Sequence, residues 1–548
     1  MKTRHKVILT VALTIAQAIV PLPHGMGGRL SALSAQEPEG EGLLLRRAIT
    51  LTDATMSLSF TGSTSNYRMY DTHDISTKQG NGTADVWPYT AALEAHCSVL
   101  EALEQLKDEE PELYAEHHDR YVTRLKILFN NLAFYAGTYK LNSYTQCQKS
   151  WTIYGVHRGG ATGQATVTGI ENVYDDQMWI CRELVRAYRL TKDYKPTDAD
   201  KYLKEATMLA NYCIDGWDCC LDNNGNEYGG ISWGPGYNSK HSCSNGPLIQ
   251  PLVWLADIYR TDDELENMTY HYIDAENNRQ KRNVRHSDLY LDFAKKIYAW
   301  QKEKLLNKNT GVYYDMCGAV AGEIGEIRIG RYTYRDHVDI NGPGGTAYTY
   351  NTGTMLAGAA ELYRVTGLEA YKTDLNNLCI NSFKAFAKGR RMSGVVYREW
   401  PTDEKTTSGF NTWFDDVLMR AYVDAVPYND ANTYATQSLE SFLQNLNYGW
   451  ENYLQENQLP IHLLDGWGDD YVTKGFHQLA FASELAMLAV WKYREDHPDA
   501  IRVPFFESAP AQQSVGTSRA VYDICGRRAS APFRKGVYVV GGKTLYLK

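Results

Sequence analysis

The sequence has little of what nucleic-acid-binding, metal-binding or membrane-spanning proteins need. Its 548 residues carry a formal net charge of −9, from 56 basic and 65 acidic side chains without a basic patch, which argues against a nucleic-acid partner. The ten cysteines contain no Cys-x-x-Cys pair and the histidines show no ligand spacing, so we expect no metal and no cofactor. No apolar run reaches the roughly 20 residues of a membrane helix, so we expect no membrane span.

The first segment has the order of a secretory signal. Lys2, Arg4 and Lys6 precede an apolar run over 7–20, and small residues follow as far as Ala35. We therefore expect residues 1–35 to be a signal peptide. The mature protein would be exported to the periplasm, the cell surface or the extracellular space.

Aromatic residues with a polar handle outnumber phenylalanine. The chain has 40 Tyr and 12 Trp but only 14 Phe. Such rings suit the faces of sugars, although a single Tyr or Trp is more often found at the edge of a core with its polar tip in water. Clustering of several rings would therefore be the evidence for a glycan site.

The body of the chain shows helical periodicity between loops rich in Gly, Asn and Asp. In the stretch 409–425, Trp413, Val417 and Leu418 recur at the spacing of one helix face. The expected helices are 86–105, 113–136, 172–191, 199–214, 246–260, 286–305, 347–366, 370–388, 409–425, 431–446 and 474–493. A repeated Tyr-Arg ending of helices indicates antiparallel hairpins, and closing six or seven of them into a ring buries the most surface.

The domain plan follows from these patterns. Residues 36–80 are interpreted as an N-terminal leader, 81–500 as the helical domain, and 501–548 as a linker with a small tail. Within the tail, 520–524, 536–540 and 544–547 predict short β-strands.

Two adjacent carboxylates, Asp175 and Asp176, stand where a loop enters the helix expected over 172–191. An aspartate there commonly caps the helix and meets the favourable end of its dipole. Retaining glycoside hydrolysis uses the same residue types, because it needs one ionised carboxylate as nucleophile and one protonated carboxyl as acid, about 5 Å apart. Mutual repulsion would raise one pKa, as the acid requires.

Four motifs in this order resemble those of glycoside hydrolase family 76, the bacterial endo-α-1,6-mannanases: Tyr174-Asp175-Asp176, Gly229-Gly230-Ile231-Ser232-Trp233, Lys240 with Ser244-Asn245-Gly246, and Tyr350-Asn351-Thr352-Gly353-Thr354. The resemblance covers roughly residues 80 to 495. It implies an (α/α)6 barrel, otherwise all-α apart from the small β-rich tail, with a glycan groove across one end. It also implies retaining, endo-acting cleavage of α-1,6-mannosidic linkages in mannan backbones of the yeast type.

By the same resemblance, Asp175 is the nucleophile and Asp176 the acid/base. The residues expected to bind substrate are Trp87, Tyr174, Trp233, Lys240, Asn245, Tyr350, Asn351 and Trp413. The partner is then α-mannan or a manno-oligosaccharide, and we expect a monomer. The tail over 521–528 and 535–543 resembles the C-terminal sorting domains of Bacteroidetes type IX secretion.

Other assignments stay open from the sequence. The acidic pairs Asp415-Asp416 and Asp469-Asp470 are alternative catalytic pairs, and His462 and His477 are interpreted as surface or core histidines. A non-catalytic glycan-binding surface protein could keep the barrel and its aromatic rings. An (α/α)6 hydrolase or lyase for a different polysaccharide could place its acids elsewhere.

Overall fold

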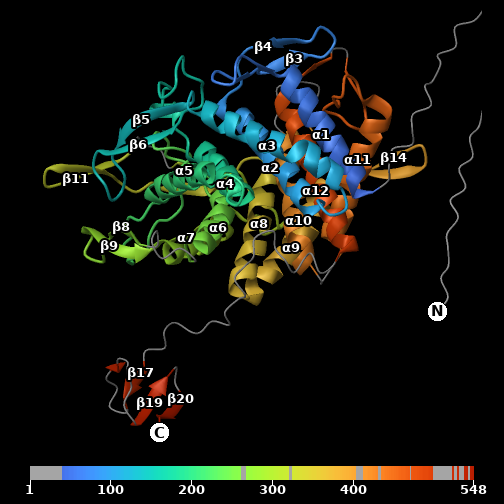
Figure 1. Cartoon of the computed structure of the whole chain (residues 1–548). Coiled ribbons are helices and arrows are strands. Elements are labelled where there is room, and N and C mark those ends of the chain that lie inside the picture. Colours follow the sequence, from blue (N-terminus) through green and yellow to red (C-terminus); the bar gives the residue numbers. More distant parts are fainter. Residues whose placement is uncertain are drawn as a thin grey trace, which may run out of the picture. The chain divides into compact units, whose positions relative to one another are not determined.

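The computed structural model describes residues 40–260, 267–319, 324–402, 411–429, 433–468 and 471–497, and four strands of the C-terminal tail (Figure 1). The expected signal peptide, the linker after residue 500 and the pair Asp469-Asp470 lie outside the described residues. In the described part of the chain, no helix combines the length and the apolar character that a membrane crossing requires.

Twelve described helices form two concentric rings. The inner ring consists of α2 (Val86–Gln105), α4 (Tyr174–Thr191), α6 (Gly246–Arg260), α8 (Thr349–Thr366), α10 (Asn411–Ala425) and α12 (Gly475–Asp496). Each inner helix packs against the next one, and α12 packs against α2, so the ring is closed. The outer helices are α3 (Pro111–Leu132), α5 (Pro196–Asp215), α7 (His286–Leu305), α9 (Glu369–Phe386), α11 (Tyr434–Tyr453) and α1 (Glu41–Leu58). The first five pack against the inner helix next to them in sequence, and α1 packs against α12. The fold is therefore an (α/α)6 barrel.

The two rings differ in burial as their sequences predict. Every residue of α12 from Gly475 to Trp491 is buried, which fits a helix enclosed on all sides. The outer helix α5 buries a stripe that includes Tyr202, Ala206 and Leu209 and leaves its other face to solvent. The eleven helices expected from periodicity are all present, with ends that move by up to seven residues.

The start of the barrel differs from the expected boundary at residue 81. The stretch interpreted as a leader contains α1, whose buried residues include Leu44, Leu45 and Leu51. Because α1 is the outer partner of α12, the barrel begins at Glu41 and not at residue 81.

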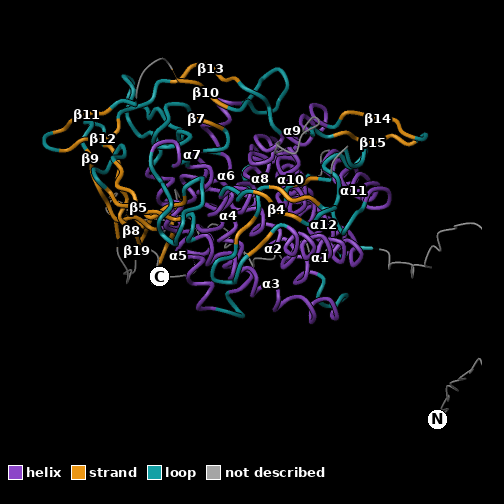
Figure 2. The backbone as a smooth tube through the Cα atoms, turned by 90° about the horizontal axis from the view of Figure 1, so that it is seen from above, coloured by secondary structure: helices purple, strands orange, loops and turns teal. Residues whose placement is uncertain are grey.

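Short antiparallel strands decorate the loops, so the domain is not purely helical. The strand pairs are β1 (Phe60–Thr61) with β2 (Arg68–Met69), β5 (Ala136–Leu141) with β6 (Lys149–Tyr154), β8 (Asn267–Ile273) with β9 (Arg279–Arg285), β11 (Glu326–Ile329) with β12 (Tyr332–Arg335), and β14 (Lys388–Met392) with β15 (Val395–Glu399). The three-stranded sheets are β16 (Val472–Thr473), β3 (Thr72–Asp74) and β4 (Gln79–Asn81), and β13 (Ile340–Gly344), β10 (Met316–Ala319) and β7 (Lys240–His241). All except β8 and β9 lie in loops that lead into an inner helix, and Figure 2 shows β11, β12, β14 and β15 at the margin of the helical body and β4 across its middle. Two 3-10 turns, Gly169–Glu171 and Val426–Tyr428, complete the described elements.

The tail contains a four-stranded antiparallel sheet in the order β18-β17-β19-β20. Its strands are β17 (Val521–Asp523), β18 (Arg528–Ala529), β19 (Gly536–Val540) and β20 (Lys543–Leu547). The three expected strands are confirmed, and β18 is an addition.

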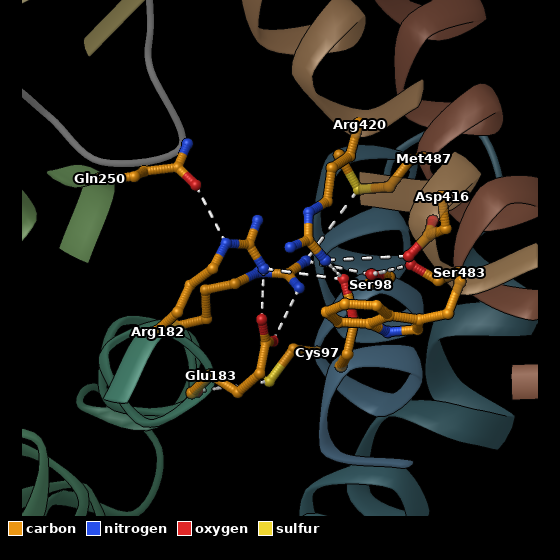
Figure 3. A network of polar contacts seen from close by, with 12 residues as sticks. Cys97, Ser98, Arg182, Glu183, Gln250, Asp416, Arg420, Ser483 and Met487 are labelled. Atoms are coloured by element: carbon orange, nitrogen blue, oxygen red, sulfur yellow. Dashed lines mark hydrogen bonds and ion pairs between the residues drawn. The ribbon is translucent and has the colours of Figure 1, made fainter. Parts of the chain in front are cut away.

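A buried polar network connects inner helices inside the ring (Figure 3). Arg182 Nε of α4 donates to Gln250 Oε1 of α6 at 3.0 Å. Arg186 of α4 bridges Glu183 Oε2 at 2.9 Å and Glu101 Oε2 of α2 at 3.0 Å. Burial would lower the pKa of the Arg186 guanidinium, but Glu183 and Glu101 raise it above its ordinary value. Charge pairing therefore takes the place of apolar packing at the centre of the barrel.

The same network reaches α10. Arg420 forms an ion pair with Glu94 of α2 and lies 3.8 Å from Asp416 Oδ2. The Trp413 indole Nε1 donates to Glu94 Oε2 at 2.8 Å. Asp416 is thus part of the barrel interior.

Candidate active site

The paired aspartates lie in the first turn of α4. The Trp233 indole Nε1 donates to Asp175 Oδ2 at 3.1 Å, and the Asp176 backbone N–H donates to Asp175 Oδ1 at 2.8 Å. The Cys243 thiol adds a hydrogen bond to the same carboxyl group. Asp175 is partly exposed, whereas Asp176 is 7% exposed. The helix start also favours negative charge at this position.

The two carboxyl groups differ in how easily they ionise. Burial raises the pKa of Asp175 to about 6, and the hydrogen bonds from Trp233 and Asp176 oppose that rise. Burial, followed by the neighbouring charge of Asp175, raises the pKa of Asp176 well above its ordinary value. Because the charge of Asp175 raises the pKa of Asp176, Asp175 ionises first and Asp176 is the carboxyl that keeps its proton to higher pH.

The loop over 216–245 holds Trp233 against Asp175. Gly229 and Gly230 have φ angles of 70° and 76°, and a Cβ on either would lie within 2.7 Å of the Trp300 ring. The Trp233 carbonyl oxygen accepts the backbone N–H of Tyr174 at 2.8 Å, which joins the loop to the start of α4. The glycine pair is therefore needed for the loop's path.

Two residues of the family motifs support this loop from inside. Lys240 is 0% exposed, and its Nζ donates to Asp218 Oδ2 at 2.8 Å and to the Gly229 carbonyl at 2.6 Å. Asn245 is also 0% exposed and bonds both the N–H and the carbonyl of Ile231, at 2.8 and 2.9 Å. Lys240 and Asn245 were expected to bind substrate, but in this structure both are enclosed and their side chains bond to the loop.

Three further expected contact residues are also buried. Tyr174 packs on Tyr212 with ring centroids 4.9 Å apart and is 1% exposed. Asn351 is 0% exposed at the start of α8, and Trp413 is 2% exposed with its indole N–H bonded to Glu94. Burial on this scale places Tyr174, Asn351 and Trp413 in the barrel wall.

Trp233 and rings from α2, α8 and α10 surround the catalytic end. Trp233 is half-buried and stacks on His241 at 4.9 Å. Phe414 packs against Tyr350 at 4.5 Å and is stacked with Trp87 at 5.7 Å. Of the rings expected from the sequence, Trp87 and Trp233 remain partly exposed, and Tyr350 lies near Asp175 although it is 5% exposed.

The alternative pair Asp415-Asp416 lies inside α10 and is buried. Thr349 Oγ1 donates to Asp415 Oδ1 at 2.8 Å, and Asp416 belongs to the interior network with Arg420. Neither carboxyl starts its helix.

Sequence reasoning missed Asp315 and Cys243. Asp315 accepts a hydrogen bond from Tyr350 Oη at 3.2 Å, and its Oδ2 lies 3.9 Å from His241 Nδ1. Burial raises the pKa of the Asp315 carboxyl. Asp315 is a lone acid ahead of a short strand, so no spacing pattern marks it.

The site shows no arrangement for a metal ion within the described ranges. No group of three or more His, Cys, Asp or Glu side chains there is close enough to hold one. The nine cysteines that the structure describes are free thiols, and Cys147 is the one among them that is not buried.

Trp233→Phe should move the acid limb of the pH–rate profile upward. The substitution keeps a ring but removes the N–H that stabilises ionised Asp175, so the pKa of Asp175 rises. A hydrogen bond to a charged group contributes about 1.5–3 kcal/mol, so we expect roughly a tenfold or greater loss of rate below pH 6. Trp400→Phe is the matched control, because its indole donates to Ser441 Oγ elsewhere in the barrel. An unshifted limb in Trp233→Phe would contradict the role of this hydrogen bond.

A closed ring of five helical hairpins and the α12–α1 pair, with an unequal pair of carboxyl groups at the start of α4, defines an (α/α)6-barrel protein equipped for glycoside hydrolysis. The chain belongs to glycosyl hydrolase family 76, since the profile of that family matches residues 126–272 and 282–469. No curated protein matches the sequence.

Solved structures share the fold at low identity. A family 76 mannosidase from Bacteroides thetaiotaomicron is 20% identical, with a TM-score of 0.57 over 83% of this chain and 99% of that one. An inactive α-1,6-mannanase of a Salegentibacter species with two adjacent aspartates replaced by alanine, in complex with α-1,6-mannotetrose, is 18% identical (TM-score 0.50; 82% and 99% covered). Dfg5 from Chaetomium thermophilum, in complex with glucosamine, is 15% identical (TM-score 0.50; 85% and 93% covered).

Proposed function

We propose that this chain is a retaining, endo-acting hydrolase of α-1,6-mannosidic linkages in mannan backbones. The observation that carries the proposal is the unequal pair at the start of α4, in which Asp175 accepts a hydrogen bond from Trp233 and Asp176 is buried beside it with a raised pKa. The Salegentibacter mannanase supports it, because replacing two adjacent aspartates accompanies loss of activity in a protein bound to an α-1,6-linked oligosaccharide.

In this mechanism Asp175 attacks the anomeric carbon while Asp176 protonates the departing glycosidic oxygen. A covalent mannosyl-Asp175 ester forms and the leaving chain departs with the proton. Asp176, now ionised, takes a proton from water, which attacks the anomeric carbon and releases Asp175. Two inversions leave the product in the α configuration.

Product analysis tests the linkage and the mode of action. We would incubate the purified protein with α-1,6-mannan backbone, branched yeast mannan and a panel of unrelated glycans that includes glucosamine-containing ones. Oligosaccharides of intermediate length early in the reaction indicate endo action, and proton NMR of the first product reads its anomeric configuration. Release of monosaccharide only, a β product, or cleavage confined to another glycan would contradict the proposal. Binding of mannan without cleavage would favour a glycan-binding protein.

The pH dependence of kcat/KM should be bell-shaped with an acid limb near pH 6. Asp175 must be ionised, so the rate rises as pH passes upward through about 6, the pKa of Asp175 in this buried setting. The rate falls again where Asp176 loses its proton, and both limbs belong to the interacting pair. A limb near pH 4, typical of an exposed carboxylate, would show that the pair is not buried in the working enzyme.

We also propose export, on the evidence of the charged and apolar order of residues 1–35 and the resemblance of the tail to sorting domains. N-terminal sequencing of the exported protein should begin after residue 30 to 40. An intact Met1 on the exported protein would contradict the signal-peptide interpretation.

A further inference from the structure

A cleft lies on the outside of the barrel. It is formed by the β5–β6 hairpin, the C-terminal half of α5 and the β8–β9 hairpin, which Figure 1 shows on the same side of the helical rings. Its volume is about 390 Å³, within the ~300–1,000 Å³ of typical ligand sites. The two hairpins come from different parts of the chain, 136–154 and 267–285, so the cleft is a product of the tertiary fold.

The walls carry aromatic rings from both hairpins. Trp151 of β6 and Tyr270 of β8 line the cleft, and both are only partly buried. Lys149 Nζ lies 5.2 Å from the centre of the Trp151 ring. Flat rings with polar groups at their edges are suited to the apolar C–H faces and hydroxyl rims of sugars.

Two polar atoms at this cleft lack protein partners. The Trp151 indole N–H and Asp215 Oδ2 are buried and have no hydrogen-bond partner within the part of the chain that the structure describes. Asp215 Oδ1, in contrast, accepts from Ser143 Oγ at 2.9 Å, Thr145 Oγ1 at 3.2 Å and Gln146 Nε2 at 3.0 Å. A buried donor and a buried carboxylate oxygen without protein partners, beside two rings, match a ligand that both accepts and donates hydrogen bonds, as hydroxyl groups do.

The cleft is separate from the catalytic pair. Trp151 packs edge-on against Tyr212 at 5.4 Å, and Tyr212 packs against Tyr174 at 4.9 Å. Tyr174 directly precedes Asp175 in α4, so this column of buried rings stands between the cleft and the site of cleavage. A sugar unit in the cleft therefore cannot be the unit attacked by Asp175.

We infer that this cleft is a second glycan-binding site, which holds a distant stretch of the same α-1,6-linked mannan chain while another stretch is cleaved. The charged side chains that line the cleft are Lys149, Lys204 and Asp215. The ligand is an uncharged hexose chain, because the exposed ring faces and the unpartnered donor and acceptor match the C–H faces and the hydroxyl groups of such a chain. The inference rests on the proposed function for the identity of the sugar. A second contact on one polymer raises the effective concentration of the chain at the catalytic site, which gives long substrates an advantage that short ones lack.

Binding is measured separately from cleavage to test the inference. In an Asp175→Asn background, retention of the full-length protein in native gels containing α-1,6-mannan reports binding without turnover. Trp151→Ala and Tyr270→Ala, from opposite walls, should each weaken retention roughly fivefold or more. Trp450→Ala is the control for Trp151→Ala, because Trp450 of α11 is also half-buried and lies beneath the guanidinium of Arg47, away from the cleft. Tyr332→Ala is the control for Tyr270→Ala, because Tyr332 is an exposed tyrosine on another hairpin.

With active protein, kcat/KM on the polymer should fall by a similar factor in Trp151→Ala and Tyr270→Ala, while kcat/KM on α-1,6-mannotetraose stays unchanged. Equal losses of kcat/KM on the polymer and on the tetraose would overturn the inference. So would gel retention equal to that of the control variants in both Trp151→Ala and Tyr270→Ala, if both are folded. If the parent protein is retained by α-1,6-mannan but cleaves neither substrate, the proposed function fails. The retention of the cleft variants relative to the parent then still shows whether the cleft binds the glycan. If α-1,6-mannan does not retain the parent protein at all, the inference is overturned whatever the activity.

Discussion

Asp175→Asn and Asp176→Asn should each lower hydrolysis of α-1,6-mannan by roughly 10⁴-fold or more, since each removes a step that the other residue cannot supply. Both variants should fold. Burial raises the pKa of both carboxyl groups above their values in the unfolded chain, so the loss of protons on unfolding favours the unfolded state as pH rises, and the neutral amides remove that effect. Thermal unfolding at pH 8 should therefore show no loss of stability.

Asp198→Asn is the matched control for these variants. Asp198 is also an aspartate in the first turn of a helix, α5, where it pairs with Lys126 at 2.9 Å on the outer ring. Its replacement should leave the rate within about twofold of the parent, as expected for a surface ion pair with no contact to substrate.

Azide separates the two roles if alanine variants are given an aryl α-1,6-mannotrioside, whose leaving group needs no acid. In Asp175→Ala, azide attacks in place of the carboxylate and a single inversion yields the β-glycosyl azide. In Asp176→Ala, azide attacks the ester on Asp175 and two inversions yield the α-glycosyl azide. The opposite pairing of variant and product would exchange the roles, and parent-like hydrolysis in both variants would place the catalytic pair elsewhere.

Arg186→Met should lower the free energy of unfolding by about 3–5 kcal/mol, the range measured when one partner of a buried ion pair is removed. Methionine fills similar space, but Glu183 and Glu101 lose the guanidinium that lies 2.9 and 3.0 Å from them inside the ring. Glu183 is 3% exposed, so water cannot take the place of Arg186, and Arg182 remains as its other ion-pair partner.

Chemical denaturation followed by tryptophan fluorescence measures this change, with midpoint and slope reported separately. Lys492→Met is the control, because Lys492 pairs with Glu495 at 2.8 Å on the surface, and its loss should change stability by less than about 1 kcal/mol. A change of that small size in Arg186→Met would show that the interior charges contribute little beyond their own desolvation.

Periodicity predicted the barrel helices well, because the spacing of apolar residues along each helix shows which of its faces is buried. The helix α1 was missed because its Ile49, Thr50 and Thr52 have modest intrinsic helix propensity and its packing partner, α12, lies at the other end of the domain. The short hairpins were missed for a similar reason, since pairs of a few residues depend on the fold around them.

The motifs located the site but not the role of each residue. Asp175 and Trp233 are brought together as their motifs indicated, whereas Lys240 and Asn245 support the loop from inside. Sequence alone does not separate these roles, because a residue that fixes a loop and a residue that touches sugar can be of the same type. Burial, which depends on the whole fold, makes the distinction.

Because α1 packs against α12, the barrel can close only after the last helix has been synthesised. During synthesis α1 leaves the ribosome before every other barrel helix, and its partner leaves after all of them. Until then Leu44, Leu45 and Leu51 lack the main surface that α1 packs against, and α2 has neighbours on one side of the ring only. The last seam closes by a contact between distant parts of the chain, which makes folding slow and leaves apolar surface open to chaperones or to a translocation channel. A chain released before α12 is complete would therefore lack a closed barrel altogether.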